Sequence, residues 1–350
     1  MSQIIDGVLK DWGERLFYEP IFGRKGRNVL GGRVPIKTNP RQAQTSATVK
    51  ARLVRTTGKA PEVMVKITGG GKNIRRIKAH LDYISRNGKV ELEDENGLIL
   101  KGADDMRDVR DAWADGRFGI PRDSEKRREA FNVMLSMPPG TNRLAVKEAA
   151  RKFAAEQFKD HQYVFAAHED EKHPHVHVCV KAVDRFGVRM NPRKADLQGW
   201  RERFAECLRK EGIAANATPR RTRGVVRKAE KQAVRWIDRD YQQGRRSSPS
   251  KVRTGRNAAV ARELAGLGEH DNPAVQAIGN ARQDILRAYG ELAKTLAKSS
   301  DSEDRKLALN IVEFVKTMPT MKTRHQMEME LARAGQGGPA RVVERGPVER

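Results

Sequence analysis

The sequence predicts an α+β fold with a mainly antiparallel central sheet of about five strands flanked by helices, followed by an all-helical basic C-terminal region. Short apolar runs typical of strands lie between Glu62 and Val183, separated by stretches with helical spacing. The last two of these runs are joined by a tight connection, which favours antiparallel pairing. Beyond Pro219 no convincing strand pattern appears and the charge becomes denser.

The amino-acid composition, and above all the net charge, indicates what kind of partner the protein binds. The 350 residues contain 69 Lys and Arg against 45 Asp and Glu, a formal net charge of +24. Such a balance predicts a polyanionic partner, and nucleic acid is favoured over a membrane surface because the basic residues run through the whole chain. No apolar run approaches the roughly 18 to 20 residues that a membrane span needs. Two cysteines exclude a disulfide framework, so we expect an intracellular protein.

The chain divides into four predicted segments. Residues 1–61 are a basic, flexible N-terminal arm, and their acidic residues argue against a signal peptide. Residues 62–224 form the sheet-containing domain, and residues 225–334 form a helical region that binds DNA or partners. Residues 335–350 are a disordered basic tail rich in Gly, Pro and Arg.

The elements of the sheet-containing domain follow from local patterns. A Gly-Gly-Gly loop separates the first strand from the first helix, an Asn-Gly turn divides a strand pair, and two prolines end the fourth strand. The expected strands cover residues 62–67, two parts of 89–100, 130–136, 163–168 and 175–183. The expected helices cover residues 74–84, 104–113, 144–158 and 197–210, and then 220–240, 252–267, 274–297 and 306–316.

Four of the eight histidines fall in one short window, from His168 to His177. Residues i and i+2 of a strand point to one face, so His175 and His177 present two imidazoles together. A hairpin through residues 169–174 would fold His168 back against that pair. Three histidines without an evident fourth protein ligand predict a metal site with an open coordination position.

Two neighbours extend this cluster, and the ion is left open. Asp170 is placed to orient a histidine, and His173, held out of the strand by Pro174, is expected to contact substrate or serve as a spare ligand. By ligand type, imidazole suits manganese, zinc, nickel or cobalt better than magnesium. A His-rich surface loop or a structural zinc site is the alternative interpretation.

One tyrosine stands apart from the apolar stripe of its helix. In the helix expected at residues 74–84, Tyr83 falls off the stripe formed by Ile77 and Leu81 and on the same side as Lys72 and Arg76. A phosphate could be held on this cationic face, with the glycine loop adding backbone N–H groups. Tyrosine can act as a covalent nucleophile, although packing is the commoner fate of a single tyrosine.

Three blocks of sequence occur in a recognisable order. Residues 69–88 contain three glycines and then Tyr83, residues 132–141 contain Ser136, and residues 168–177 follow the pattern His-x-Asp-x-x-His-Pro-His-x-His. This order resembles the conjugative and mobilisation relaxases of the HUH endonuclease superfamily, in the MobA and T-DNA border endonuclease branch (MOB-P-like). Residues 217–224 are a weaker fourth match.

The resemblance implies a mechanism and roles for residues. Tyr83 would attack the scissile phosphodiester at an origin of transfer and become joined to the DNA 5′ end, with Asp170 orienting a histidine. His168, His175 and His177 would hold a divalent ion, for which Mg2+ or Mn2+ is expected and Zn2+ or Ni2+ would also suit three histidines. The residues expected to contact DNA are Lys72, Arg76, Arg86, Ser136, His173, Arg220 and Arg221.

The resemblance also implies partners. These are single-stranded or supercoiled DNA at a transfer origin, an accessory DNA-binding protein of the relaxosome and a type IV coupling protein. The tail arginines resemble a signal for type IV secretion, which would carry the protein with its DNA into a recipient cell.

Two other functions remain open. A metal-dependent nuclease or phosphodiesterase could use activated water in place of Tyr83 and form no covalent adduct. A non-enzymatic basic DNA-binding protein would need only the charge, with the histidines holding structural zinc.

Overall fold

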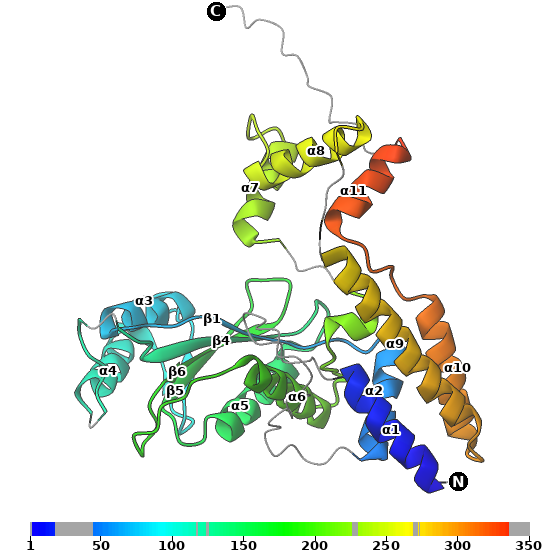
Figure 1. The fold of residues 1–350 in the computed structure, drawn as a ribbon. Coiled ribbons are helices and arrows are strands. Elements are labelled where there is room, and N and C mark those ends of the chain that lie inside the picture. Colours follow the sequence, from blue (N-terminus) through cyan, green and yellow to red (C-terminus); the bar gives the residue numbers. More distant parts are fainter. Residues whose placement is uncertain are drawn as a thin grey trace, which may run out of the picture. The chain divides into compact units, whose positions relative to one another are not determined.

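The computed structural model describes residues 2–17, 45–116, 118–123, 126–225, 230–268, 272 and 274–335 (Figure 1). The chain separates into two compact units. We call Glu19–Thr218 the sheet unit, and Met1–Tyr18 together with Pro219–Arg350 the helical unit. Within the described ranges, no helix has the length and apolar character that crossing a bilayer requires.

The sheet unit is built on six antiparallel strands, which correspond to the six strand ranges expected from the sequence and agree with the expected count of about five. Their order across the sheet is β1-β4-β6-β5-β2-β3, which places β6 and β5 in the centre. The strands are β1 (Met64–Gly69), β2 (Leu92–Asp94), β3 (Ile99–Leu100), β4 (Ala130–Ser136), β5 (Tyr163–His168) and β6 (His175–Lys181). Every strand pair is antiparallel, so the α+β prediction is confirmed.

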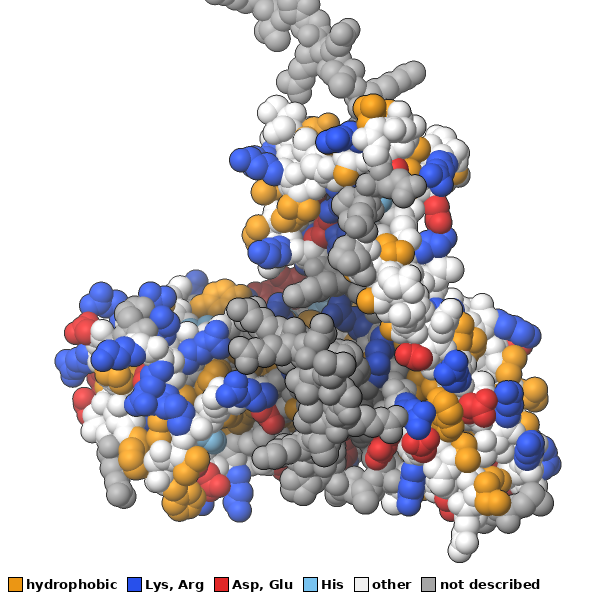
Figure 2. Space-filling model, viewed as in Figure 1, with side chains coloured by type: hydrophobic (Ala, Val, Ile, Leu, Met, Phe, Trp, Pro, Cys, Tyr) orange, Lys and Arg blue, Asp and Glu red, His pale blue; other side chains and the backbone are white. Residues whose placement is uncertain are grey.

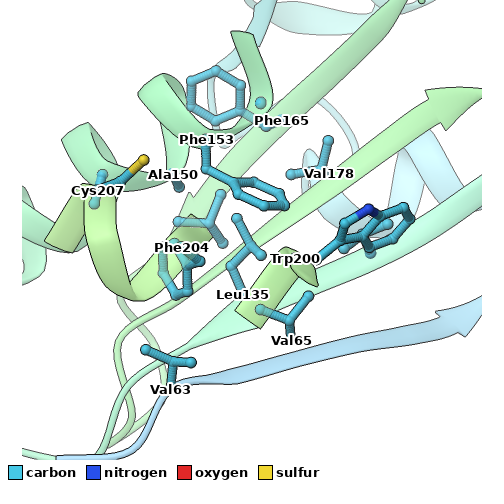
Figure 3. Packing of buried hydrophobic residues seen from close by; sticks show 14 of the residues in the cluster. Val63, Val65, Leu135, Ala150, Phe153, Phe165, Val178, Trp200, Phe204 and Cys207 are labelled. Atoms are coloured by element: carbon cyan, nitrogen blue, oxygen red, sulfur yellow. The ribbon is translucent and has the colours of Figure 1, made fainter. Parts of the chain in front are cut away.

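Helices cover both faces of this sheet. They are α3 (Ile74–Ile84), α4 (Gly102–Asp115), α5 (Arg143–Gln157) and α6 (Lys194–Lys210), which alternate with the strands in the expected order. Helices α5 and α6 cover one face, where Phe153, Phe204 and Trp200 pack on β-strand valines and leucines (Figure 3). Helices α3 and α4 cover the other face, where Ile77 and Leu81 pack on small strand residues.

Alternation along the strands assigns each side chain to a face. In β6, Val176, Val178 and Val180 belong to the core beneath α5 and α6. Cys179 belongs to the core beneath α3 and α4. Because successive side chains of a strand point to opposite faces, His175 and His177 share the α3 side with Cys179.

The expectation of a flexible arm over residues 1–61 is wrong for two stretches. Helix α1 (Ser2–Phe17) belongs to the helical unit, and α2 (Ser46–Thr57) belongs to the sheet unit. Residues Val49 and Leu53 of α2 are fully buried, and Arg52 pairs with Glu202 of α6 at 3.3 Å. The apolar residues at i and i+4 gave a helical signal that the surrounding Arg, Lys and Thr obscured. Residues 18–44 lie outside the described part.

The helical unit confirms the expected all-helical C-terminal region. Its helices are α1, the 3-10 helix η1 (Arg220–Arg223), α7 (Gln232–Gln242), α8 (Lys251–Leu264), α9 (Ala274–Ala297), α10 (Ser302–Lys316) and α11 (Arg324–Arg333). The phenol of Tyr289 in α9 donates to the carbonyl of Thr222, which ties α9 to η1. Helix α11 was not expected, and residues 336–350 of the expected disordered tail are not described. The expected segment boundaries at residues 61 and 224 stay predictions.

Candidate active site

The pairing of β5 with β6 brings three histidines together at one end of the sheet. His168 is directly opposite His175, and Ala166 is opposite His177. The ring centroids of His168 and His177 are 4.7 Å apart, and each ring is 5.2 Å from that of His175. One ring nitrogen from each residue lies within 4.8 Å of the others. The hairpin expected from the sequence therefore makes the expected cluster, which we call the histidine triad.

Backbone carbonyls fix two rings of the triad. Nδ1 of His175 lies 2.9 Å from the carbonyl oxygen of His173, and Nε2 of His168 lies 2.8 Å from that of Ile84. A carbonyl oxygen only accepts, so each of these nitrogens carries the proton and donates it. Such outer hydrogen bonds orient the imidazoles of metal sites and leave the other ring nitrogen as the ligand atom.

The third ring, that of His177, is buried with an unused nitrogen. Its Nδ1 has no hydrogen-bond partner among the residues that the structure describes. Burial, with the neighbouring histidines, lowers the pKa of His177 to about 3, and burial also lowers the pKa of His168. Both rings are therefore neutral at pH 7 and have lone pairs to offer. This donor set fits a divalent metal ion.

Tyr83, the expected nucleophile, lies beside the triad. It is the penultimate residue of α3, its side chain is 55% exposed, and its ring centroid is 5.8 Å from that of His177 and 6.4 Å from that of His168. The phenol is thus accessible to a large substrate and close to the rings of the histidine triad. The structure brings Tyr83 and the triad together as the sequence predicted.

Arg86 links the tyrosine to the histidine hairpin. It follows the end of α3 with φ of 51°, in the left-handed region, as does Asn87 with φ of 56°. This turn brings the guanidinium over the Tyr83 ring at 5.0 Å, where it also donates to the Tyr83 carbonyl. The same group donates to Nδ1 of His168 at 3.1 Å. A metal ligand at that nitrogen would require the guanidinium to move.

Asp170 acts on Arg86 and reaches His168 through it. Its Oδ2 accepts hydrogen bonds from Nε and Nη2 of Arg86 at 3.2 and 2.6 Å. These bonds lower the pKa of Asp170 and raise that of Arg86, so both stay charged. We expected Asp170 to orient a histidine directly, and the structure inserts Arg86 between them. Arg86 and Asp170 thus place one positive and one negative charge beside the histidine triad and Tyr83.

His80 is a site residue that the sequence interpretation missed. It precedes Tyr83 by three residues in α3, and its ring stacks at 6.1 Å from the Tyr83 ring and 6.4 Å from that of His177. Its Nε2 is buried with no partner in the described part of the chain, and burial, with His168, lowers its pKa to about 4. The i, i+3 spacing from Tyr83 was the signal that could have found it.

Arg143 also went unpredicted, and it supports the hairpin from behind. It is the first residue of α5, and its guanidinium donates to the carbonyl oxygens of His168 and Glu171. The loop between β5 and β6 is thereby attached to α5. Nothing in the local sequence separates Arg143 from the many other arginines, because its partners are backbone atoms of a distant segment.

The expected DNA contacts differ in position. Ser136 pairs with His175 in register, but its side chain is buried and donates to the Met137 carbonyl. His173 is exposed in the hairpin loop.

Two of the expected basic contacts lie toward the start of α3, away from the nucleophile. A rise of about 1.5 Å per residue puts Arg76 about 10 Å from Tyr83 along α3 and Lys72 farther, near the start of the helix. Arg220 and Arg221 belong to the helical unit. All of these contacts stay predictions.

The glycine loop packs tightly between β1 and α3. A Cβ on Gly71 would lie 2.2 Å from Cγ1 of Ile77, and one on Gly70 would lie 2.4 Å from the carbonyl oxygen of Ala130. The carbonyl of Gly71 accepts from the amides of Glu129 and Ala130. The loop precedes the first turn of α3, whereas Tyr83 is in the last turn. The expectation that this loop adds N–H groups beside Tyr83 is therefore wrong, and close packing explains the glycines.

Comparison with known proteins agrees with this geometry. Residues 83–213 match a family model described as "Relaxase: MobA/VirD2-like, nuclease domain". The chain is 30% identical over 184 residues to the T-DNA border endonuclease VirD2 of Rhizobium radiobacter, covering 47% of this chain and 43% of that protein. It is 29% identical over 212 residues to the protein of the same name from Rhizobium rhizogenes, covering 52% and 49%.

The matched region starts at Tyr83 and includes the whole triad, Asp170 and α6. The chain spans less than half the length of the curated relatives it matches. The resemblance inferred from three sequence motifs is confirmed by these matches. Residues 83–213 of the chain are thus similar to the nuclease domain of MobA/VirD2-like relaxases.

Proposed function

We propose that the chain is a relaxase, a site-specific and strand-specific DNA-nicking enzyme that works through a covalent tyrosine adduct. The observation that carries the proposal is the exposed Tyr83 ring lying 5.8 Å from the ring of His177 in a triad suited to a divalent ion. The matches to T-DNA border endonucleases support DNA as the substrate.

The reaction exchanges one phosphodiester for another. The Tyr83 oxygen forms a bond to the scissile phosphorus, its proton leaves, and the bond from phosphorus to the 3′ oxygen breaks. The 3′ oxygen takes a proton, and the 5′ phosphate stays attached to the tyrosine. Because the bond energy is retained in the adduct, the freed 3′ hydroxyl can reverse the step and rejoin the strand.

His168, His175 and His177 are the residues that would hold the divalent ion, which supplies charge stabilisation and positioning of the scissile phosphate when bound. The two carbonyls that fix His168 and His175 hold these rings in place before any ligand arrives. Preorganisation of this kind lowers the cost of reaching the reactive arrangement.

Arg86 is the positive group closest to the nucleophile in this account. Its guanidinium lies 5.0 Å from the centre of the Tyr83 ring, where it can pair with the scissile phosphate beside the nucleophile. Asp170 keeps the guanidinium in this position. His80 is neutral at pH 7 and packs against the same ring, so it limits the rotation of Tyr83 without adding charge.

In the cell, this chemistry would serve the transfer of a DNA strand to a recipient. The adduct would pilot the nicked strand during conjugative transfer or mobilisation, from the bacterial cytoplasm into a recipient through a type IV secretion system. An accessory DNA-binding protein and a coupling protein are the partners that such a role requires. The net charge of +24 supports DNA binding.

A denaturing gel tests the proposal. The full chain is mixed with labelled single-stranded oligonucleotides that tile the transfer region of the mobile element encoding it, with Mn2+ or with EDTA. Three proteins are compared: wild type, Tyr83→Phe, and the control Tyr241→Phe, whose half-buried tyrosine lies in the helical unit.

The proposal predicts a metal-dependent covalent band with wild type and Tyr241→Phe and none with Tyr83→Phe. Cleavage that survives in Tyr83→Phe without a covalent band would identify a hydrolytic nuclease instead. Binding without cleavage of any tile would leave a basic DNA-binding protein.

A further inference from the structure

The largest aromatic side chain exposed on the described part of the helical unit is Trp236, in α7. Its side chain is 51% exposed, although tryptophan is a residue that proteins bury on average. Helix α7 has no residue in the buried class, yet Val234, Ile237 and Tyr241 are partly covered. Trp236 is therefore not the residue that attaches this helix to its unit.

The helical periodicity of α7 separates an attached face from an outer face. Val234, Ile237 and Tyr241 are spaced by three and four residues and share the covered side. Trp236, Arg235 and Arg239 lie on the opposite side, and all three are exposed. The indole thus stands on the outer surface with two guanidinium groups as helical neighbours.

Helix α7 is held firmly by the turn that follows it. Asp238 accepts hydrogen bonds from the amide and the hydroxyl of Ser250 at 2.8 and 3.0 Å. Ser250 is the N-cap of α8 and accepts from the amide of Arg253. The carboxylate on the covered side of α7 therefore joins this helix to the start of α8, and Trp236 lies on the opposite side of α7.

The surface around Trp236 is strongly basic. Residues 230–262 contain nine Lys or Arg against three Asp or Glu. Two acidic residues of this stretch are paired: Asp240 lies 2.6 Å from Arg245 and a looser 3.7 Å from Arg239, and Glu230 pairs with Arg256. Figure 2 shows Lys and Arg side chains on the outer surface of the α7–α8 pair.

We propose that Trp236, with Arg235 and Arg239, forms a binding site for single-stranded DNA that is separate from the nicking site. A base stacks on the indole, and the two guanidinium groups contact the adjoining phosphates. Stacking on an exposed aromatic ring within a cationic surface is the recognised way in which proteins hold single strands without sequence preference. The choice of DNA as ligand rests on the proposed function.

The charge pattern favours DNA over a protein partner. A tryptophan that anchors a protein interface sits in a well-packed apolar pocket surrounded by contacts that exclude water. The outer face of α7 instead carries Arg235, Arg239 and two glutamines around the indole, and the charge of Asp240, four residues after Trp236, is paired with Arg245. A protein that docks on such a surface would have to be acidic, whereas a single strand matches both the ring and the cations.

Fluorescence anisotropy with the full chain tests the site. The probe is a fluorescein-labelled thirty-nucleotide oligothymidine, with EDTA present so that no cleavage occurs. The variants are Trp236→Ala, Trp236→Tyr, which keeps an aromatic face, and the double variant Arg235→Gln/Arg239→Gln. The control is Leu309→Ala, which removes another exposed apolar side chain of the helical unit, 69% exposed in α10.

Trp236→Ala is expected to weaken binding by about 5- to 100-fold, as loss of one stacked base implies, with the slope of affinity against salt unchanged. Trp236→Tyr should stay within about threefold of wild type. The arginine double variant should weaken binding and reduce the salt slope by one to two. Wild-type affinity for Trp236→Ala, or an equal loss in Leu309→Ala, would overturn the proposal.

A second readout separates this site from the nicking site. Covalent adduct formation is measured with the shortest oligonucleotide that wild type nicks, at saturating DNA. Trp236→Ala should form the adduct at the wild-type rate, because the indole touches no reacting atom. If no adduct forms with any protein while Trp236→Ala still weakens oligothymidine binding, the proposed function fails and the binding site stands. A protein partner at this surface would leave DNA affinity unchanged in Trp236→Ala and so contradict the proposal.

Discussion

The two faces of the six-stranded sheet differ sharply although the same strands supply both. Toward α5 and α6 the central strand β6 presents Val176, Val178 and Val180, which pack on phenylalanines of those helices. Toward α3 it presents His175 and His177, with Cys179 farther along. One face is a continuous apolar core, and the other combines an apolar cluster with the histidine triad and an exposed tyrosine.

This difference shows how a small domain can contain buried histidines and remain folded. Burying unpartnered imidazole nitrogens costs stability, so the opposite face must supply the apolar area that keeps the strands together. Substitutions of the histidine triad on the α3 face should therefore affect chemistry and metal binding with little effect on folding. Substitutions on the α5 and α6 face should do the reverse.

The largest effect is expected from His177→Gln on the α3 face. The variant removes one metal-ligating nitrogen and should lower Mn2+ affinity and the rate of adduct formation by about 100-fold or more. Calorimetric titration with Mn2+ and the gel assay measure the two losses. Because His177 is buried with an unused nitrogen, unfolding of the metal-free variant should differ from wild type by less than about 1 kcal/mol.

The matched control is His161→Gln. Nδ1 of His161 is bonded to the carbonyl of Lys181, at the opposite end of β6 from the triad. This variant should bind Mn2+ as wild type does. Equal Mn2+ affinity in wild type and His177→Gln would show that the histidine triad is not the metal-binding site.

The opposite face is tested by Phe153→Ala. Phe153 of α5 is fully buried and packs against Phe158 and Phe204. Its loss should reduce the free energy of unfolding by about 3 to 5 kcal/mol, measured by urea denaturation. The folded fraction should still form the adduct at the wild-type rate. A stable variant with a lost active site would contradict the separation of the two faces.

An intermediate effect is expected from Arg86→Lys. Lysine keeps the charge but loses the fork that bonds Asp170 and His168 together, and it cannot hold the same position over the Tyr83 ring. We expect adduct formation to slow by about tenfold at saturating DNA and Mn2+. Arg122→Lys, which changes an exposed arginine of the same unit, serves as the control. A wild-type rate in Arg86→Lys would show that the guanidinium does not act on the nucleophile.

The smallest effect concerns pH. Burial lowers the pKa of His80 to about 4 and that of His177 to about 3, whereas an unfolded histidine titrates near 6.5. Between about pH 6.5 and 4 the unfolded chain therefore binds more protons than the folded chain at these residues. Their contribution to stability is thus lost as the pH falls through this window, and the metal-free protein should become easier to unfold.

His80→Gln should flatten this dependence, since it removes one histidine whose pKa differs between the folded and unfolded chain. Urea denaturation in EDTA at pH 7, 6, 5 and 4.5 measures the slope. His173→Gln, which changes an exposed loop histidine, should leave the slope as in wild type. Identical slopes for His80→Gln and wild type would mean that His80 is not kept neutral by the fold.

Sequence patterns were sufficient for the parts of the molecule that depend on local spacing. Strand alternation placed His175 and His177 on one face, and the helical wheel placed Tyr83 off the apolar stripe of α3. Both inferences need only the geometry of one element and a short hairpin. The order of strands and helices in the sheet unit followed for the same reason.

Interactions between distant segments were not predictable in this way. The bond from Asp170 to Arg86 depends on a left-handed turn at Arg86 and Asn87; asparagine favours this conformation, but nothing local indicates it for Arg86 or names Asp170 as its partner. Helix α2 is attached to the sheet unit in part by the ion pair between Arg52 and Glu202, which lies 150 positions later in the chain. The role of His80 depends on α3 lying against β6 at the height of His177.

The most direct test of the central claim is to locate the nucleotide on the protein. Wild-type protein is reacted with an unlabelled oligonucleotide that contains the nick site, the adduct is trimmed with nuclease and protease, and the peptides are analysed by mass spectrometry. The account predicts one modified peptide, with a phosphate-linked nucleotide on Tyr83. A nucleotide on any other side chain, or complete cleavage with an unmodified Tyr83, would contradict it.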